Sequence, residues 1–168
     1  ANIPILKRGE MLAELFNPCY GVAVIGSHGK TTSTAIAVDM LLKSGRNPSY
    51  MIGGELCSNH QHAMLGEDNV FITEADESDA SFLYLTPDVI ILTNIEPDHM
   101  DTYDNSIEVL KKTFIDFINC LPEKGVAILC LDDSLVRDIL PHITANTITY
   151  GYHLDAQYRA HDFHQNAL

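Results

Sequence analysis

Apolar residues follow two alternating patterns along the chain: short continuous runs, and longer segments in which they recur every three or four positions. The short runs predict buried strands at 21–25, 49–52, 70–73, 88–93, 126–131 and 147–150. The longer segments predict helices at about 7–16, 31–43, 106–120 and 135–140. This alternation predicts an α/β fold with a mostly parallel sheet flanked by helices.

Two of the predicted helices carry their apolar residues at spacings that are typical of a helix packed on a core. The first of these helices is expected to end at Asn17 and Pro18, because a residue before proline disfavours helical dihedrals. The two sets of apolar residues are Met11, Leu12, Leu15 and Phe16, and Ile107, Leu110, Phe114, Phe117 and Ile118.

A glycine-containing turn at 26–32, with the sequence G-S-H-G-K-T-T, joins a predicted strand to a predicted helix. Strand, glycine turn, Lys-Thr and helix follow one another in the order that a phosphate-binding loop requires. In such a loop, backbone N–H groups and the positive end of the helix converge on phosphate oxygens. Lys30 would then reach the β- and γ-phosphates, and the Thr31 hydroxyl would ligate Mg²⁺.

The loop departs from the usual pattern G-x-x-x-x-G-K-[ST] in its length. Val24 stands where that pattern has its first glycine, and Gly26 lies only three residues before Gly29. The loop is therefore predicted to be a shortened variant. The alternative is an ordinary strand–turn–helix with a surface lysine, but the strand and helix on either side favour the phosphate loop.

Two further polar clusters follow predicted strands, at 74–81 and at 94–101. Glu74 comes directly after a strand, where its carboxylate oxygens would suit Mg²⁺, although a solvated acid would occupy the same position. His99 could bind a second metal ion or orient a phosphate, and a structural histidine is the alternative. Because ligands bind beyond the carboxyl ends of parallel strands, we expect these clusters and the loop to form one site.

Composition and charge narrow the class of protein further. The chain has 168 residues, 46% of them hydrophobic, which is enough for one domain with a core. Its formal net charge of −13 argues against nucleic acid as a partner and makes Mg²⁺ an expected part of any nucleotide site. No apolar run is long enough to cross a bilayer and no signal-peptide pattern is visible, so we expect no membrane partner. The four cysteines form no C-x-x-C pair, which favours reduced thiols and a cytoplasmic location.

Three blocks of the sequence resemble the Mur ligases. Residues 26–32 are similar to the family's G-T-H-G-K-T-T loop, with Ser27 in place of the usual threonine. Residues 74–82, E-A-D-E-S-D-A-S-F, and 93–101, T-N-I-E-P-D-H-M-D, resemble two blocks of the member that adds L-alanine. The related tripeptide-recycling ligase typically has tyrosine where this chain has Ser78. The similarity extends over about residues 3–160.

The resemblance implies a P-loop-like central ATP-binding domain at 21–168, cut at its C-terminal end and preceded by a lead-in helix and linker at 1–20. The whole enzyme would use ATP and Mg²⁺ to join L-alanine to UDP-N-acetylmuramate through an acyl phosphate, in peptidoglycan precursor synthesis. Both ends of the chain look cut, so we expect a fragment that is inactive alone and able to self-associate. Alternatives are the tripeptide-recycling ligase, a nucleotide-binding module without its own catalysis, and a P-loop hydrolase or kinase.

The resemblance also implies a role for individual residues. Lys30, Glu74 and His99 would be catalytic, and Thr31, Glu74 and His99 would hold magnesium ions. The substrate would contact Ser78, Asp79, Ser81 and Asn94. The ATP phosphates would lie against Gly26, Ser27, His28, Gly29, Lys30, Thr31 and Thr32.

Overall fold

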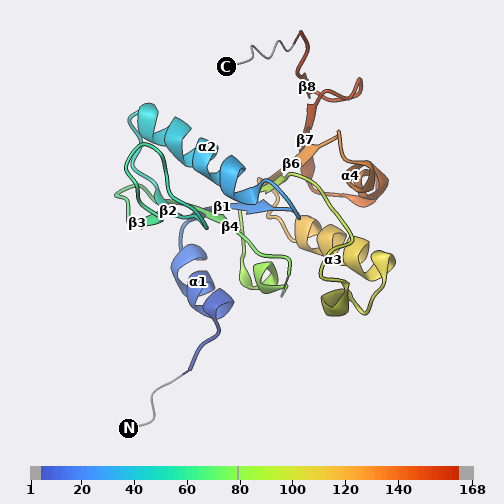
Figure 1. Ribbon diagram of the computed structural model, residues 1–168, viewed down its shortest axis with the longest axis horizontal. Helices are drawn as coiled ribbons and strands as arrows, with labels where there is room; N and C mark the ends of the chain where they lie inside the picture. The colour runs from blue at the N-terminus through green and yellow to red at the C-terminus, as the bar shows by residue number, and fades with distance from the viewer. Residues whose placement is uncertain (1–4, 79, 163–168) are drawn as a thin grey trace.

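A computed structural model of the protein describes residues 5–78 and 80–162. An eight-stranded sheet runs through the molecule in the order β3-β2-β4-β1-β5-β6-β7-β8 (Figure 1). Neighbouring strands are parallel except β2 and β3, which pair antiparallel. The strands are β1 (Tyr20–Ile25), β2 (Ser49–Met51), β3 (Ala63–Met64), β4 (Val70–Glu74), β5 (Val89–Leu92), β6 (Val126–Cys130), β7 (Asn146–Gly151) and β8 (Tyr158–Arg159).

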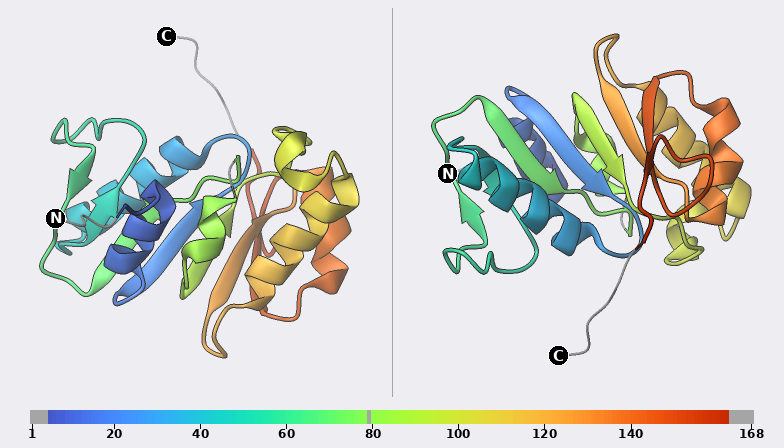
Figure 2. Two further views of the ribbon diagram at one scale, coloured as in Figure 1. Left: turned by 90° about the horizontal axis from the view of Figure 1, so that it is seen from below. Right: turned by 90° about the horizontal axis from the view of Figure 1, so that it is seen from above.

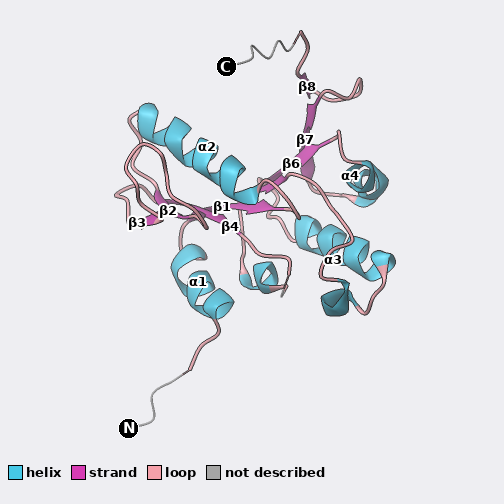
Figure 3. Cartoon of the chain, viewed as in Figure 1, coloured by secondary structure: helices cyan, strands magenta, loops and turns pink. Residues whose placement is uncertain are grey.

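Helices cover both faces of this sheet (Figure 3). Figure 2 shows α1 and α3 in front of the sheet when the molecule is seen from below, and α2 in front of it when seen from above. The α-helices are α1 (Arg8–Phe16), α2 (Lys30–Lys43), α3 (Ile107–Asn119) and α4 (Ser134–Ile139), and the 3₁₀ helices are η1 (Ser81–Tyr84), η2 (Met100–Tyr103) and η3 (Leu140–His142). The predicted α/β fold with a mostly parallel sheet is confirmed.

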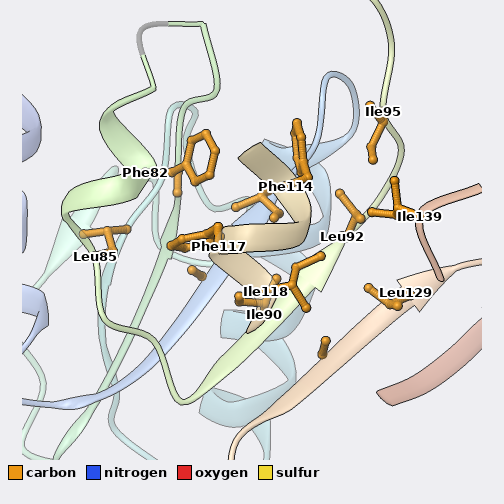
Figure 4. Packing of buried hydrophobic residues seen from close by; sticks show 14 of the residues in the cluster. Phe82, Leu85, Ile90, Leu92, Ile95, Phe114, Phe117, Ile118, Leu129 and Ile139 are labelled. Carbon is orange, nitrogen blue, oxygen red and sulfur yellow. The ribbon is translucent and has the colours of Figure 1, made fainter. Parts of the chain in front are cut away.

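The larger of two hydrophobic cores lies between one face of the sheet and the helices α1, α3 and α4. In it, the Phe82 ring of η1 meets Phe117 edge-to-face at a centroid distance of 4.8 Å, and Phe114 at 5.6 Å. Figure 4 shows Ile118 of α3 next to Ile90 of β5, and Phe117 of the same helix on the side of Phe82 and Leu85. The predicted apolar face of α3 is thus confirmed, with four of its five residues buried: Leu110, Phe114, Phe117 and Ile118.

The prediction for the first helix is wrong at two positions. Leu12 and Phe16 are buried, but Met11 and Leu15 are more than half exposed. The buried residues of this helix, which include Gly9 and Ala13, share one side of it, and positions 11 and 15 lie about 150° and 110° from the centre of that side.

The smaller core lies between the sheet and α2. Val38, which is fully buried, packs there with Tyr50, Ile52, Leu56 and Ile72. Gly45 follows α2 with a φ of 83°, and the Gly45 N–H donates to the Leu42 carbonyl, so the helix ends in a left-handed turn that glycine adopts readily. This core fixes α2, and therefore the loop that precedes it, against the sheet.

We expect the burial of Phe114 to matter far more for stability than the apolar character of Met11. Phe114→Ala leaves a cavity under α3 and should lower the free energy of unfolding by about 3–5 kcal/mol. Met11→Ala should change it by less than about 0.5 kcal/mol, because that side chain remains largely in water. Urea unfolding followed by circular dichroism measures both values, and similar losses for the two variants would contradict the packing described here.

Candidate functional site

Three neighbouring strands bring the predicted polar clusters together. β1 lies between β4 and β5 and is parallel to both, with Val24 opposite Glu74 and Ile25 opposite Leu92. The carboxyl ends of these strands therefore lie at one edge of the sheet, and the segments 26–29, 75–80 and 93–99 leave from that edge. The chain proceeds from β1 toward β2 on one side, whereas β5 leads to β6 on the other. Such a switch point is where open α/β sheets bind ligands.

Glycine is required at one position of the loop between β1 and α2. Gly26 has a φ of 128°, and a β-carbon there would lie 2.3 Å from the Thr93 hydroxyl and 2.8 Å from the Asn94 carbonyl oxygen. Gly29 precedes α2 with a left-handed φ of 81°, but it has open space around it. No side chain in the described part of the chain caps the N-terminus of α2. Its first N–H groups can therefore meet an anion.

The segment after β5 holds this loop in shape. The Asn94 amide clamps His28 from both sides: its Oδ1 accepts from the His28 N–H and its Nδ2 donates to the His28 carbonyl, each at 2.8 Å. The Thr93 hydroxyl donates to the same carbonyl at 2.7 Å, and the Ser27 hydroxyl accepts from the Glu96 N–H at 2.8 Å. Asn94 thus supports the loop, a contact that the sequence pattern did not indicate.

Lys30 extends from the first turn of α2 back over the loop. Its Nζ donates to the Gly26 carbonyl at 2.7 Å and to the Ser27 carbonyl at 3.4 Å. It also forms an ion pair with Glu77 Oε2 at 2.7 Å. Glu77 is only 5% exposed. The sequence pattern missed this residue because nothing distinguishes it from the other acids of its segment.

Thr31 and Glu74 also meet at this edge. The Thr31 hydroxyl donates to Glu74 Oε2 at 2.7 Å. Gly53 leaves room for this carboxylate, since a β-carbon on Gly53 would lie 2.1 Å from Glu74 Oε1. A hydroxyl and a carboxylate so close together are hard oxygen donors of the kind that Mg²⁺ takes, so these two residues fit the predicted metal.

His99 lies on the segment after β5 with a left-handed φ of 49°, and its ring is about half exposed. Its Nε2 is 3.8 Å from Asp98 Oδ2. Within the described ranges, no group of three or more His, Cys, Asp or Glu side chains is arranged to hold a metal ion. A metal role for His99 and Glu74 together therefore stays a prediction.

The residues of segment 74–81 that were expected to contact substrate differ in their burial and in their hydrogen bonds. Ser81 is buried, and its hydroxyl donates to the Asp76 carbonyl at 3.5 Å. The Ser78 carbonyl accepts from the Thr102 hydroxyl at 2.6 Å, which ties this segment to η2. Asp79 lies outside the described residues.

A groove of about 540 Å³ begins at the N-terminus of α2 and follows that helix. An ion pair between Lys43 and Asp39 lies at its far end, and the hydrogen bond from Lys43 holds the pKa of the Asp39 carboxyl below its usual value. The groove is lined by Thr31, Thr32, Ala35, Ile36, Asp39, Lys43, Glu55, Leu56, Cys57 and Ser58.

The sequence and the fold are both similar to those of known proteins. The sequence pattern of the family described as Mur ligase middle domain matches residues 24–167. The fold is similar to that of UDP-N-acetylmuramate:L-alanyl-gamma-D-glutamyl-meso-diaminopimelate ligase (MPL) from Neisseria meningitides. The TM-score is 0.75 and the identity 22%, over 84% of this chain and 49% of that one.

Two further structures, both from Thermotoga maritima, share the fold. UDP-N-acetylmuramate-alanine ligase MurC has a TM-score of 0.68 and 25% identity, over 85% of this chain and 31% of that one. MurF ligase, in complex with ADP, has a TM-score of 0.57 and 20% identity, over 86% of this chain and 35% of that one. The chain spans less than half of the length of each of these proteins.

The two loop glycines should respond differently to the same substitution. Gly26→Ala combines an unfavourable φ with a clash against Thr93 and Asn94, which follow β5. It should therefore lower the free energy of unfolding by more than about 2 kcal/mol. Gly29→Ala has only the dihedral cost, about 1 kcal/mol. Chemical denaturation of both variants compares them, and equal losses would show that Thr93 and Asn94 do not confine the loop.

Proposed function

Since the chain belongs to the Mur ligase family, whose middle-domain pattern matches residues 24–167, we propose that it is the ATP-binding domain of the ligase that joins L-alanine to UDP-N-acetylmuramate. The observation that carries this proposal is the meeting of Lys30, Thr31 and Glu74 around a glycine loop at the N-terminus of α2. The similarity to MurC, at 25% identity, supports the choice of substrate. The reaction would take place in the cytoplasm, during peptidoglycan precursor synthesis.

The proposed reaction has two steps. A carboxylate oxygen of UDP-N-acetylmuramate attacks the γ-phosphorus of ATP, so that ADP leaves and an acyl phosphate forms. The amine of L-alanine then attacks the acyl carbon, loses a proton and displaces inorganic phosphate, which leaves the amide. Two anions must meet in the first step, so the site has to offset their charge and align them.

The residues of this chain divide that work. The loop amides, the N-terminus of α2 and Lys30 would bind the β- and γ-phosphates. Thr31 and Glu74 would hold Mg²⁺, and His99 with Glu74 would hold a second ion. When bound, Mg²⁺ supplies positive charge to the phosphoryl oxygens. Asn94 would keep the loop in the shape that aims its N–H groups at the phosphates.

The substrate would lie beside these groups. We propose contacts from Ser78, Asp79, Ser81 and Asn94, which belong to the two segments that flank the loop. The groove along α2 begins at Thr31, next to the proposed reaction centre, and its volume suits part of a sugar–nucleotide substrate.

In the described part of the chain, the helices are too short or too polar to span a bilayer.

A second candidate is the tripeptide-recycling ligase. The observation in its favour is the TM-score of 0.75 to MPL from Neisseria meningitides, compared with 0.68 to MurC; a second murein peptide ligase, from Psychrobacter arcticus, has the same 0.68. The observation against it is Ser78, where that ligase typically has tyrosine. A third candidate is a nucleotide-binding module whose catalysis needs the rest of a longer protein, since the chain spans less than half of its structural neighbours.

The first test is nucleotide binding. Lys30→Ala removes the only cation that contacts the loop in the described structure, so affinity for Mg-ADP should fall at least about tenfold. Calorimetric titration of the chain measures this, with Lys112→Ala on α3 as a matched control that should bind like the unchanged chain. Equal affinity in the two variants would contradict the assignment of the loop.

The second test distinguishes the two ligases. In the full-length enzyme that contains this domain, phosphate release from ATP with UDP-N-acetylmuramate should depend on L-alanine. The tripeptide should stimulate release by less than about a tenth as much, because the two acceptors differ by many groups that a specific site contacts. Greater stimulation by the tripeptide would transfer the assignment to the second candidate. Release that needs neither acceptor would favour a P-loop hydrolase.

A further inference from the structure

The ammonium group of Lys30 has an acceptor within the chain for each of its N–H donors. It has three N–H donors. The structure gives it three acceptors, which are the carbonyls of Gly26 and Ser27 and the carboxylate of Glu77. A phosphate oxygen would therefore bind to Lys30 by replacing one of these contacts. The contact that is replaced determines where the ammonium group lies when phosphate is bound.

Glu77 is held more firmly than the two carbonyls. Its side chain is 6% exposed, and its own carbonyl accepts a hydrogen bond from the hydroxyl of Tyr103, a residue that is 2% exposed. The next residue, Ser78, is tied to Thr102 through its carbonyl. The backbone around Glu77 is thus anchored to η2, which follows His99 directly.

The energetic cost of breaking each contact differs as well. If Lys30 left Glu77, a buried carboxylate would remain without its countercharge, which is strongly unfavourable. The contact with the Ser27 carbonyl is the longest of the three, at 3.4 Å, and the loop that carries it is partly exposed. This carbonyl can accept a hydrogen bond from water once the lysine has moved, without any movement of the loop, so it is the contact most easily exchanged.

We propose that Glu77 is the positioning residue of the phosphate-binding lysine. It keeps its ion pair with Lys30 when phosphate binds, and Lys30 exchanges the Ser27 carbonyl for a phosphate oxygen. This inference rests on the proposed nucleotide site. The carboxylate offsets the charge of the ammonium, so Glu77 does not increase affinity for the nucleotide. Its role is to orient the Lys30 side chain toward the phosphate.

The chain without nucleotide offers a direct measurement. Glu77→Gln keeps the shape of the side chain but removes the charge, so Lys30 should react about tenfold faster with an amine-acylating reagent, as followed by peptide mass spectrometry. Asp76→Asn is the matched control, because Asp76 is the neighbouring acid and its ion pair is with Arg8 instead. The control should leave the reactivity of Lys30 unchanged. Thermal unfolding of each variant verifies that it is folded.

The full-length ligase offers a second measurement that a purely structural role would not move in the same way. Glu77→Gln should lower kcat about tenfold while changing KM for ATP by less than about threefold, since orientation is lost and positive charge at the site is not. Asp76→Asn should leave both constants as they are. Loss of folded protein also lowers the apparent kcat at unchanged KM, so kcat is calculated per folded molecule from the folded fraction of each variant. A kcat per folded molecule equal to that of the unchanged enzyme would overturn the proposal.

Tyr103→Phe provides a variant for the case in which Glu77→Gln does not fold. It removes only the hydroxyl that anchors the Glu77 carbonyl, and it should also raise the reactivity of Lys30, by a smaller factor. Unchanged Lys30 reactivity in the folded variants would overturn the proposal. If the unchanged chain binds no Mg-ADP, the proposed nucleotide site fails, whereas the lysine reactivity still decides whether Glu77 positions Lys30.

Discussion

The parallel pairing of β1 with β4 and β5 is the constraint on which the rest of the site depends. Ala23, Val24 and Ile25 are completely buried in the middle of the sheet, so β1 cannot shift without exposing them. Its register determines where the loop begins and places Glu74 beside Val24. If β4 shifted by one residue against β1, the side chain at position 74 would turn to the opposite face of the sheet and lose its contact with Thr31.

Electrostatics adds a second constraint. The chain carries a formal net charge of −13, and the lysine over its loop is paired with a buried acid. A phosphate group therefore meets little free positive charge from side chains here. If the loop binds phosphate as proposed, backbone N–H groups and the N-terminus of α2 would provide most of the protein's attraction, and a divalent ion would provide the remainder. An α/β fold with a glycine turn meets this need because its donors belong to the backbone.

Much of the fold and part of the site could be predicted from the sequence. Apolar runs located six strands, and the carboxyl ends of parallel strands explain why 26–32, 74–81 and 94–101 meet. The burial of Glu77 could not be predicted, because it depends on Tyr103 and η2, which are distant in sequence. The clamp from Asn94 to His28 is another long-range contact without a sequence signal. Two-residue strands such as β3 have no periodicity to detect.

Those same two-residue strands have a consequence for how copies of the protein meet. The sheet ends with β3 on one side and β8 on the other. An edge strand offers unpaired N–H and C=O groups to which a strand from another molecule can add. Within the described residues, β3 covers only Tyr50 and Met51 of β2, and β8 covers only Tyr150 and Gly151 of β7. Residues 146–149 of β7 therefore remain an edge at which a strand from a second copy could add. The central strands β4, β1, β5 and β6 each have a partner strand on both sides, so their backbone groups are not available for such addition.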